Sequence, residues 1–164
     1  LDEAYFEYNR AQDTPVATEE ILKYPNVVGL RTFSKAYGLA GVRVGYAFGP
    51  AELIEGINKV AVPFSVSSVA QAGAIASLEA RDELAVRVEE TCAQRSRLTD
   101  ALKEYGTPES QSNFVWLPNG PEGFATDMAA HGVLVRAFPE GTRITVTNEE
   151  ETNALLSALQ RVLD

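Results

Sequence analysis

One stretch of the sequence, TFSKAYGLAGVRVGY at residues 32–46, places a lysine among small and apolar residues. Burial disfavours a charged ammonium, so a lysine in such surroundings loses its proton readily. A neutral amine is the form that attacks carbonyl groups. Ser34 adds a hydroxyl beside Lys35, and Arg43 adds a guanidinium whose geometry suits phosphate. The pattern indicates Schiff-base chemistry, and a loop lysine that points to solvent between two strands is the alternative.

Around this stretch, the apolar pattern predicts a buried strand at residues 26–30 and a second strand at residues 42–48. A short helix is expected at residues 51–59, because Pro50 suits the first helical position. Residues 67–105 have helical spacing, either as one helix or as two with a bend where Asp82 caps the second.

The remainder of the chain alternates between strand and helix patterns. Asn148 is expected to cap the last helix, whose first turn carries acidic residues that favour the helix dipole. The expected elements are strands at 113–117, 132–138 and 143–147, and helices at 123–131 and 149–163.

Charge and composition restrict the function classes. Of the 164 residues, 45% are hydrophobic and 23% are charged, which is typical of a globular protein. The formal net charge of −9 repels a polyphosphate backbone, so we expect no nucleic-acid partner. An anionic ligand must therefore be bound by a few local arginines.

Cysteine, histidine and hydropathy give further expectations. Cys92 is the only cysteine, which excludes an internal disulfide and fits a reducing compartment. With a single histidine as well, a zinc site built by the protein is not expected. No apolar run approaches the ~20 residues that span a bilayer, so we expect a cytoplasmic protein without a membrane partner. The chain begins at Leu1 rather than at methionine, and we expect it to be part of a longer polypeptide.

Residues 34–46 resemble the cofactor-lysine segment of fold-type I pyridoxal-phosphate (PLP) aminotransferases. More narrowly, they resemble the histidinol-phosphate and aromatic amino-acid (phenylalanine) aminotransferases. Other segments agree in the same chain order, namely residues 2–5, 110–115, 132–136 and 141–146.

The resemblance implies an α/β fold that forms the C-terminal portion of such an enzyme. Residues 1–75 would be the remnant of the PLP-binding large domain, with part of its sheet. Residues 76–164 would be a connecting helix followed by a small C-terminal α/β domain.

The resemblance also implies roles for individual residues. Lys35 would bind PLP as a Schiff base and then act as the catalytic base. Asp2 would face the pyridine nitrogen and keep the ring protonated, so that the ring can accept electrons. Tyr5 would donate its hydroxyl to the 3-oxygen of the cofactor, and Ser34 and Arg43 would bind the phosphate. Taken alone, Asp2 and Tyr5 are also consistent with a strand-end acid and a core aromatic residue.

In the C-terminal half, Arg143 would bind the substrate carboxylate through two parallel hydrogen bonds, with Asn113 nearby. Taken alone, an arginine such as Arg143 is more often a surface ion-pair partner. Arg136 lies on a strand that carries an arginine in the family, and its role is either substrate-binding or structural. His131 is expected to contact the C-terminal end of a helix. Two aromatic residues are expected in the core, Phe114 and Trp116.

The function implied is transfer of an amino group between an aromatic amino acid and a 2-oxo acid, such as 2-oxoglutarate. One alternative is histidinol-phosphate transamination in histidine biosynthesis, and another is a fragment without activity of its own. The full-length parent would be a homodimer. Its N-terminal half would supply the rest of the pocket, including the aromatic residue that stacks on the PLP ring.

Overall fold

The structure, a computed structural model, describes residues 1–163. The chain divides into two compact units, Leu1–Ala85 and Val86–Asp164. The boundary falls within α4 (Arg81–Ala101). The domain division after residue 75 lies inside the preceding helix, α3 (Ser68–Glu79), and stays a prediction. Both units combine helices with a small sheet, which confirms the expected α/β class.

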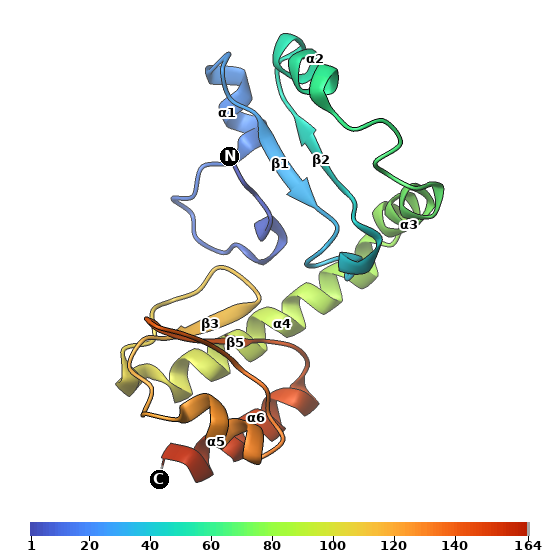
Figure 1. The fold of residues 1–164 in the computed structure, drawn as a ribbon. Coiled ribbons are helices and arrows are strands. Elements are labelled where there is room, and N and C mark those ends of the chain that lie inside the picture. The colour runs from blue at the N-terminus through green and yellow to red at the C-terminus, as the bar shows by residue number, and fades with distance from the viewer. Residues whose placement is uncertain (164) are drawn as a thin grey trace. The chain divides into compact units, whose positions relative to one another are not determined.

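The sheet of the first unit is built on two antiparallel strands, β1 (Gly29–Thr32) and β2 (Gly45–Phe48). The N-terminal residues lie along the other edge of β1, where Asp2 forms a parallel bridge with Leu30 (Figure 1). Both expected strands exist but begin later than predicted. β2 starts only at Gly45 because a 3₁₀ turn, η2 (Ala40–Val42), and the left-handed Arg43 precede it.

The helices of the first unit agree with the sequence more closely. The helix predicted at 51–59 is α2 (Ala51–Val60). The long helical stretch is divided at Ala80 into α3 and α4, so the version with two helices is correct. Asp82 lies inside the first turn of α4 rather than at its cap. The hydroxyl of Ser67 caps α3 by accepting the Ala70 N–H at 3.1 Å.

Two short helices near the N-terminus were not predicted, η1 (Phe6–Tyr8) and α1 (Ala17–Lys23). The N-cap residue of α1, Val16, has no side chain that caps the helix. The Ala17 N–H is instead accepted by the Glu3 carboxylate at 2.6 Å. Because the capping group is distant in sequence, no local signal marks this helix.

The second unit has an antiparallel sheet in the order β3-β5-β4, with β3 (Phe114–Leu117), β5 (Gly141–Thr145) and β4 (Arg136–Phe138). Its other elements are η3 (Lys103–Tyr105), α5 (Phe124–Ala130) and α6 (Glu149–Leu163). Every element predicted here exists. The strand expected at 132–138 is shorter, because Gly132 has a φ of 82° and Val133 N–H still bonds to the Met128 carbonyl of α5.

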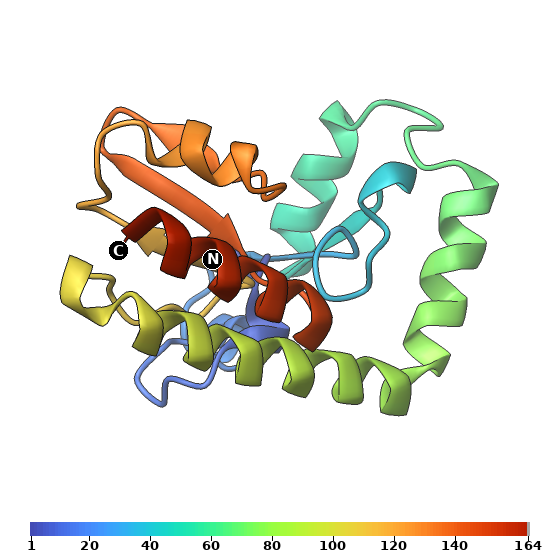
Figure 2. The same ribbon diagram turned by 90° about the horizontal axis from the view of Figure 1, so that it is seen from below.

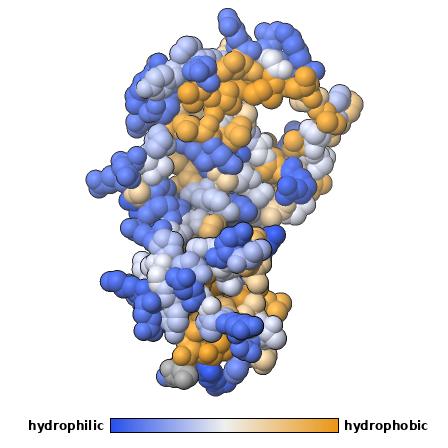
Figure 3. Space-filling view, turned by 60° about the vertical axis from the view of Figure 1, so that its left-hand side comes forward, coloured by the Kyte–Doolittle hydropathy of each residue, from blue (hydrophilic) through white to orange (hydrophobic). Residues whose placement is uncertain are grey.

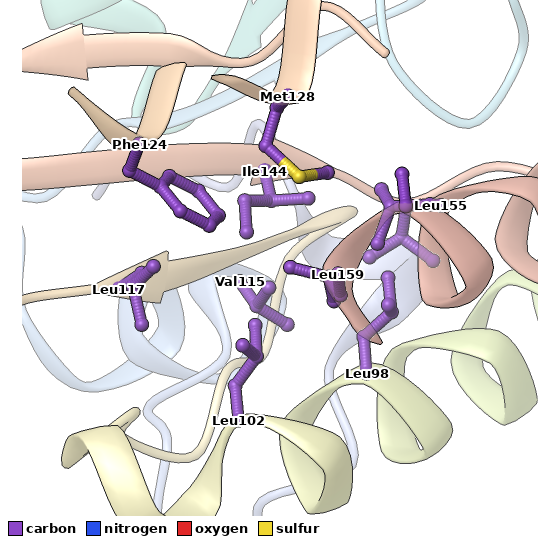
Figure 4. Close-up of a cluster of buried hydrophobic side chains, with 11 residues drawn as sticks. Leu98, Leu102, Val115, Leu117, Phe124, Met128, Ile144, Leu155 and Leu159 are labelled. Atoms are coloured by element: carbon purple, nitrogen blue, oxygen red, sulfur yellow. The ribbon is translucent and has the colours of Figure 1, made fainter. Parts of the chain in front are cut away.

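The core of the second unit lies on one face of this sheet. Side chains from α4, α5 and α6 converge on Val115, Leu117 and Ile144 (Figure 4). In Figure 2, α6 runs beside α4, and the Arg97 guanidinium donates to the Asn153 side chain at 2.6 Å between them. The helices therefore cover one face of the sheet.

Phe114 and Trp116 lie on the opposite face, because side chains alternate along β3. Their assignment to the core was wrong: both are half-buried, and the Trp116 ring packs 5.8 Å from the Phe138 ring. Two smaller predictions are confirmed. Asn148 caps α6 by accepting the Glu151 N–H at 2.9 Å, and the His131 ring contacts the Asp127 carbonyl of α5 at 2.9 Å.

None of the helices formed by residues 1–163 combines the length and the hydropathy that a membrane-spanning helix requires.

Candidate functional site

The loop that joins β1 to β2 carries Lys35. The Lys35 carbonyl accepts the Gly38 N–H at 2.9 Å, and Gly38 has a φ of 72°. Glycine adopts this left-handed conformation without the penalty that a Cβ brings. Next to Lys35, the Ser34 N–H donates to the Thr32 hydroxyl at 3.0 Å. The lysine therefore lies at the start of a tight turn whose backbone is held by local hydrogen bonds.

Buried neighbours hold this loop against the unit. Phe33 is 4% exposed and Ala36 is 1% exposed, whereas Lys35 between them is half-buried. The Phe33 ring packs against the rings of Tyr37 and Tyr46, with centroids 4.8 and 5.9 Å away. Burial raises the pKa of the Tyr37 hydroxyl, and the negative charge of Glu7 adds to this effect. Packing on both sides of Lys35 thus limits where its side chain can point.

The N-terminal segment brings two further predicted site residues to the same unit. The Lys35 Nζ lies 5.3 Å from the centroid of the Tyr5 ring. Asp2 pairs with Leu30 on β1, and its carboxylate accepts the Ala4 N–H at 3.0 Å. Pairing of the chain start with β1 therefore brings the Tyr5 ring to the lysine and holds the Asp2 carboxylate on the segment beside β1.

Arg43 lies at the far end of the lysine loop and is exposed. Its backbone is left-handed (φ 58°, ψ 59°), and its Nη1 donates to the Ala40 carbonyl at 2.6 Å. This bond folds the guanidinium back over η2, and its remaining N–H groups keep the capacity to bind an anion. Ser34 and Arg43 are in one loop, although no hydrogen bond joins their side chains within residues 1–163.

In the second unit, Arg143 lies on the sheet face opposite the core. It is paired with Trp116 on β3 and with Arg136 on β4. Its Cζ lies 5.4 Å from the centroid of the Phe114 ring. Its Nε is buried without a hydrogen-bond partner among the described residues. A buried unpaired donor costs about 1–3 kcal/mol, so an acceptor at this atom would stabilise the arginine.

Arg136 and Arg143 are directly opposite each other on neighbouring strands. Like charges in this arrangement are destabilising unless an anion lies between them. Asn113 does not join the two arginines: its carbonyl accepts the Val146 N–H at 2.8 Å, and its side chain bonds to neither arginine in the described part of the chain. The second unit therefore places two adjacent cations on the sheet face opposite its core.

Sequence reasoning missed a buried ion pair in the first unit. Glu3 is 9% exposed, and its Oε2 accepts from the Arg31 Nε at 2.8 Å. Burial lowers the pKa of the Arg31 guanidinium, but bonding to Glu3 and to Tyr46 outweighs this, so the pKa is raised. The signal that could have revealed the pair is the position of Glu3, a charged residue between Asp2 and Tyr5 in a segment expected to end a strand.

A family model and two curated relatives all identify the chain as similar to aminotransferases. Residues 1–159 match the family model "Aminotransferase class I and II". The chain is 62% identical over 163 residues to an aromatic amino acid aminotransferase of Corynebacterium glutamicum strain R, covering 99% of this chain and 47% of the relative. It is 53% identical to an aromatic amino acid aminotransferase of Nocardia farcinica, covering 95% of this chain and 46% of that protein.

Among solved structures, the chain resembles the histidinol-phosphate aminotransferase from Sinorhizobium meliloti in complex with pyridoxal-5'-phosphate. The TM-score is 0.83 at 31% identity, covering 99% of this chain and 48% of that structure. The chain thus spans about half the length of the curated relatives it matches.

Proposed function

The chain belongs to the class I and II aminotransferase family, and we propose that it is the C-terminal portion of a PLP-dependent enzyme. The reaction is transfer of an amino group between an aromatic amino acid and a 2-oxo acid, with 2-oxoglutarate as the expected acceptor. The aromatic amino acid aminotransferase named for the relative from Corynebacterium glutamicum, at 62% identity, supports this substrate class.

The observation that carries the proposal is the contact between Lys35 and Tyr5 in the first unit. An amine able to bind the PLP aldehyde lies against a phenol able to donate to the 3-oxygen beside that aldehyde. Asp2 supplies a carboxylate for the pyridine nitrogen from the N-terminal segment that pairs with β1. Ser34 and Arg43 supply a hydroxyl and a guanidinium for the phosphate. The donor set in the first unit therefore fits the cofactor.

Each residue then has a defined chemical task. Lys35 would hold the cofactor through its amine, and the same amine, when free, would take the proton from the substrate Cα. Asp2 would keep the pyridine nitrogen protonated. Tyr5 would donate its hydroxyl to the 3-oxygen and so lower the proton affinity of the nitrogen that Lys35 contributes. Bound PLP supplies the electron sink that stabilises the charge left at Cα.

In the second unit, Arg143 is proposed to bind the substrate carboxylate. Its buried Nε without a partner supports this role, because a carboxylate oxygen would satisfy that donor. Arg136, directly across the strand pair, adds positive charge at the same position. Asn113 is proposed to contact the same carboxylate. Within residues 1–163 its side chain makes no hydrogen bond to either arginine.

Histidinol-phosphate transamination is the second candidate. It is supported by the similarity to the Sinorhizobium meliloti structure, at 31% identity. The higher identity to the aromatic enzymes favours the first candidate. The proposal also includes a homodimeric parent, a cytoplasmic location, and a 164-residue chain that is inactive on its own.

The test uses the full-length polypeptide that contains this chain, purified with PLP. Phenylalanine and histidinol phosphate are compared as amino donors to 2-oxoglutarate at equal concentration. We expect kcat/KM to be higher for phenylalanine. A higher value for histidinol phosphate would select the second candidate, and no turnover with either donor would contradict the aminotransferase proposal.

A further inference from the structure

Glu3 uses both of its carboxylate oxygens inside the first unit. Oε1 accepts the N–H of Ala17 at 2.6 Å, and Oε2 accepts from the Arg31 Nε at 2.8 Å. The side chain is nearly excluded from water, at 9% exposed for the whole residue. Glu3 therefore connects three segments: the chain start, the first turn of α1 and strand β1.

The Arg31 guanidinium is fixed by aromatic rings as well as by Glu3. Its Cζ lies 3.8 Å from the centroid of the Phe6 ring and 5.3 Å from that of Phe48. A guanidinium that lies over aromatic faces and also makes a charge-assisted hydrogen bond has little rotational freedom. Arg31 is thus a rigid point on β1, at the end of the strand that leads into the Lys35 loop.

These contacts lie on both sides of Tyr5 in the chain. Glu3 precedes Tyr5 and bonds to Arg31, and Phe6 follows Tyr5 and contacts the same guanidinium. Successive side chains of an extended segment point to opposite faces, so anchoring Glu3 on one face leaves Asp2 on the other. The backbone bond from Glu3 N–H to the Leu30 carbonyl, at 2.8 Å, keeps this register.

We infer that the Glu3–Arg31 pair positions the cofactor-binding residues, by fixing Asp2 and Tyr5 relative to Lys35. The inference rests on the proposed function. Glu3 and Arg31 act through Asp2 and Tyr5 and are positioning residues. A buried ion pair often contributes little net stability compared with apolar residues of similar volume. We therefore assign its effect to the geometry of the site.

Other titratable groups surround the pair. Tyr46 on β2 is directly opposite Arg31, and Glu7 of η1 lies within electrostatic range of both Arg31 and Glu3. Burial raises the pKa of the Glu7 carboxyl, against the lowering effects of a backbone hydrogen bond and of Arg31. A test must therefore distinguish displacement of Asp2 and Tyr5 from a change in the local charge. This requires a variant that keeps the positive charge at residue 31.

The test uses the full-length PLP-loaded enzyme with Glu3→Gln, Arg31→Lys and the double variant Glu3→Gln/Arg31→Met. Arg31→Lys keeps the charge but loses the planar group that lies over Phe6. Glu20→Gln is the matched control, because Glu20 pairs with the exposed Lys23 at 2.8 Å in α1 of the same unit. The measurements are the PLP dissociation constant, the pH midpoint of the visible absorbance of the bound cofactor, and the melting temperature of the apoprotein.

We expect PLP to bind about tenfold more weakly in Glu3→Gln and Arg31→Lys, equivalent to ~1.4 kcal/mol. The pH midpoint should rise, because a displaced Tyr5 hydroxyl no longer stabilises the anionic 3-oxygen. The double variant removes both charges and should regain most of the lost melting temperature, but not the PLP affinity or the midpoint. Glu20→Gln should change none of these values.

A double variant with wild-type PLP affinity and wild-type midpoint would overturn the inference, because the pair would then serve stability alone. Wild-type PLP affinity together with a wild-type pH midpoint in Arg31→Lys would overturn it as well. Failure of the proposed function would differ in kind, since the unsubstituted protein would then show no cofactor attached to Lys35.

Discussion

The Lys35 Nζ lies 5.3 Å from the centre of the Tyr5 ring, although the two residues belong to separate segments of the chain. The contact exists because residues 1–3 pair with β1, whose continuation carries the lysine. A lysine over a tyrosine face gains about 0.5–1 kcal/mol at an exposed site and more when it is desolvated. The first unit therefore brings the amine and the phenol together without help from any residue outside it.

This contact makes Lys35 the expected point of cofactor attachment. Borohydride reduction of the full-length PLP-loaded protein, followed by peptide mapping, should locate the phosphopyridoxyl group on Lys35. The other lysines of the chain serve as internal controls, because Lys23 and Lys59 are exposed and form ion pairs with Glu20 and Glu55. A phosphopyridoxyl group on Lys23, Lys59 or Lys103 in place of Lys35 would contradict the assignment of Lys35 as the attachment point.

Tyr5→Phe removes the hydroxyl and keeps the aromatic ring. The phenylalanine keeps the aromatic face beside Lys35, so PLP should remain bound and the melting temperature should change little. Without the hydroxyl, the pH midpoint of the visible absorbance should rise, because the 3-oxygen of the cofactor loses a hydrogen-bond donor. Tyr24→Phe, on an exposed tyrosine of the same unit, is the control. An unchanged midpoint in Tyr5→Phe would show that the Tyr5 hydroxyl does not bind the cofactor.

Arg143→Lys should raise KM for amino acid and oxo acid while PLP stays bound. A lysine is a point charge and cannot make two parallel hydrogen bonds to a carboxylate. The expected loss is about 1.5–3 kcal/mol, the range for a charge-assisted hydrogen bond. Arg136→Lys is the comparison on the neighbouring strand, where the side chain is exposed and should tolerate the change better. Unchanged KM values for both substrates of Arg143→Lys would exclude it from the site.

The cap of α6 offers a test of the second unit that does not involve catalysis. Asn148→Ala removes the acceptor of the Glu151 N–H and should lower the free energy of unfolding by about 1 kcal/mol. Trp116, the single tryptophan, reports unfolding of this unit by fluorescence in denaturant at low protein concentration. Gln160→Ala, on the exposed surface of α6, should cause no loss because alanine favours helix. Equal losses in both variants would argue against the cap.

Local signals in the sequence were enough for most of the fold. α2 and α6 were predicted almost to the residue, because Pro50 and Asn148 mark their starts. The strands were found but misplaced by a few residues. Their ends depend on turns at Arg43 and Gly132, where left-handed backbone overrides an apolar pattern.

The features that sequence reasoning missed depend on contacts between distant segments. α1 is capped by Glu3, and Glu3 is paired with Arg31, so neither appears in a window of neighbouring residues. Trp116 was assigned to the core by its type, although the pleat of β3 turns it to the face of Arg143. The site residues followed from family resemblance, and spacing alone did not distinguish them from surface residues.

The first unit leaves many large apolar side chains in water. α2 has no buried residue, and an apolar region extends across the upper part of Figure 3. Val60 is 83% exposed, Val62 is 72% exposed and Phe64 is 101% exposed. Phe64 also has a φ of 57°, a left-handed conformation that is strained for a bulky residue. A surface of this kind promotes association.

We therefore predict that the 164-residue chain alone self-associates, binds PLP weakly and has no measurable transaminase activity. Catalysis requires the cofactor ring to be held so that the Cα–H bond crosses its plane, which takes contacts on both faces and at the phosphate. Lys35 and Tyr5 supply only part of this grip, so any cofactor that attaches would lack orientation. Sedimentation should show oligomers that Val60→Ser/Val62→Ser reduces, since these changes remove exposed apolar area. A monomeric chain with turnover of phenylalanine and 2-oxoglutarate in the ordinary range of ~1–10³ s⁻¹ would contradict the prediction.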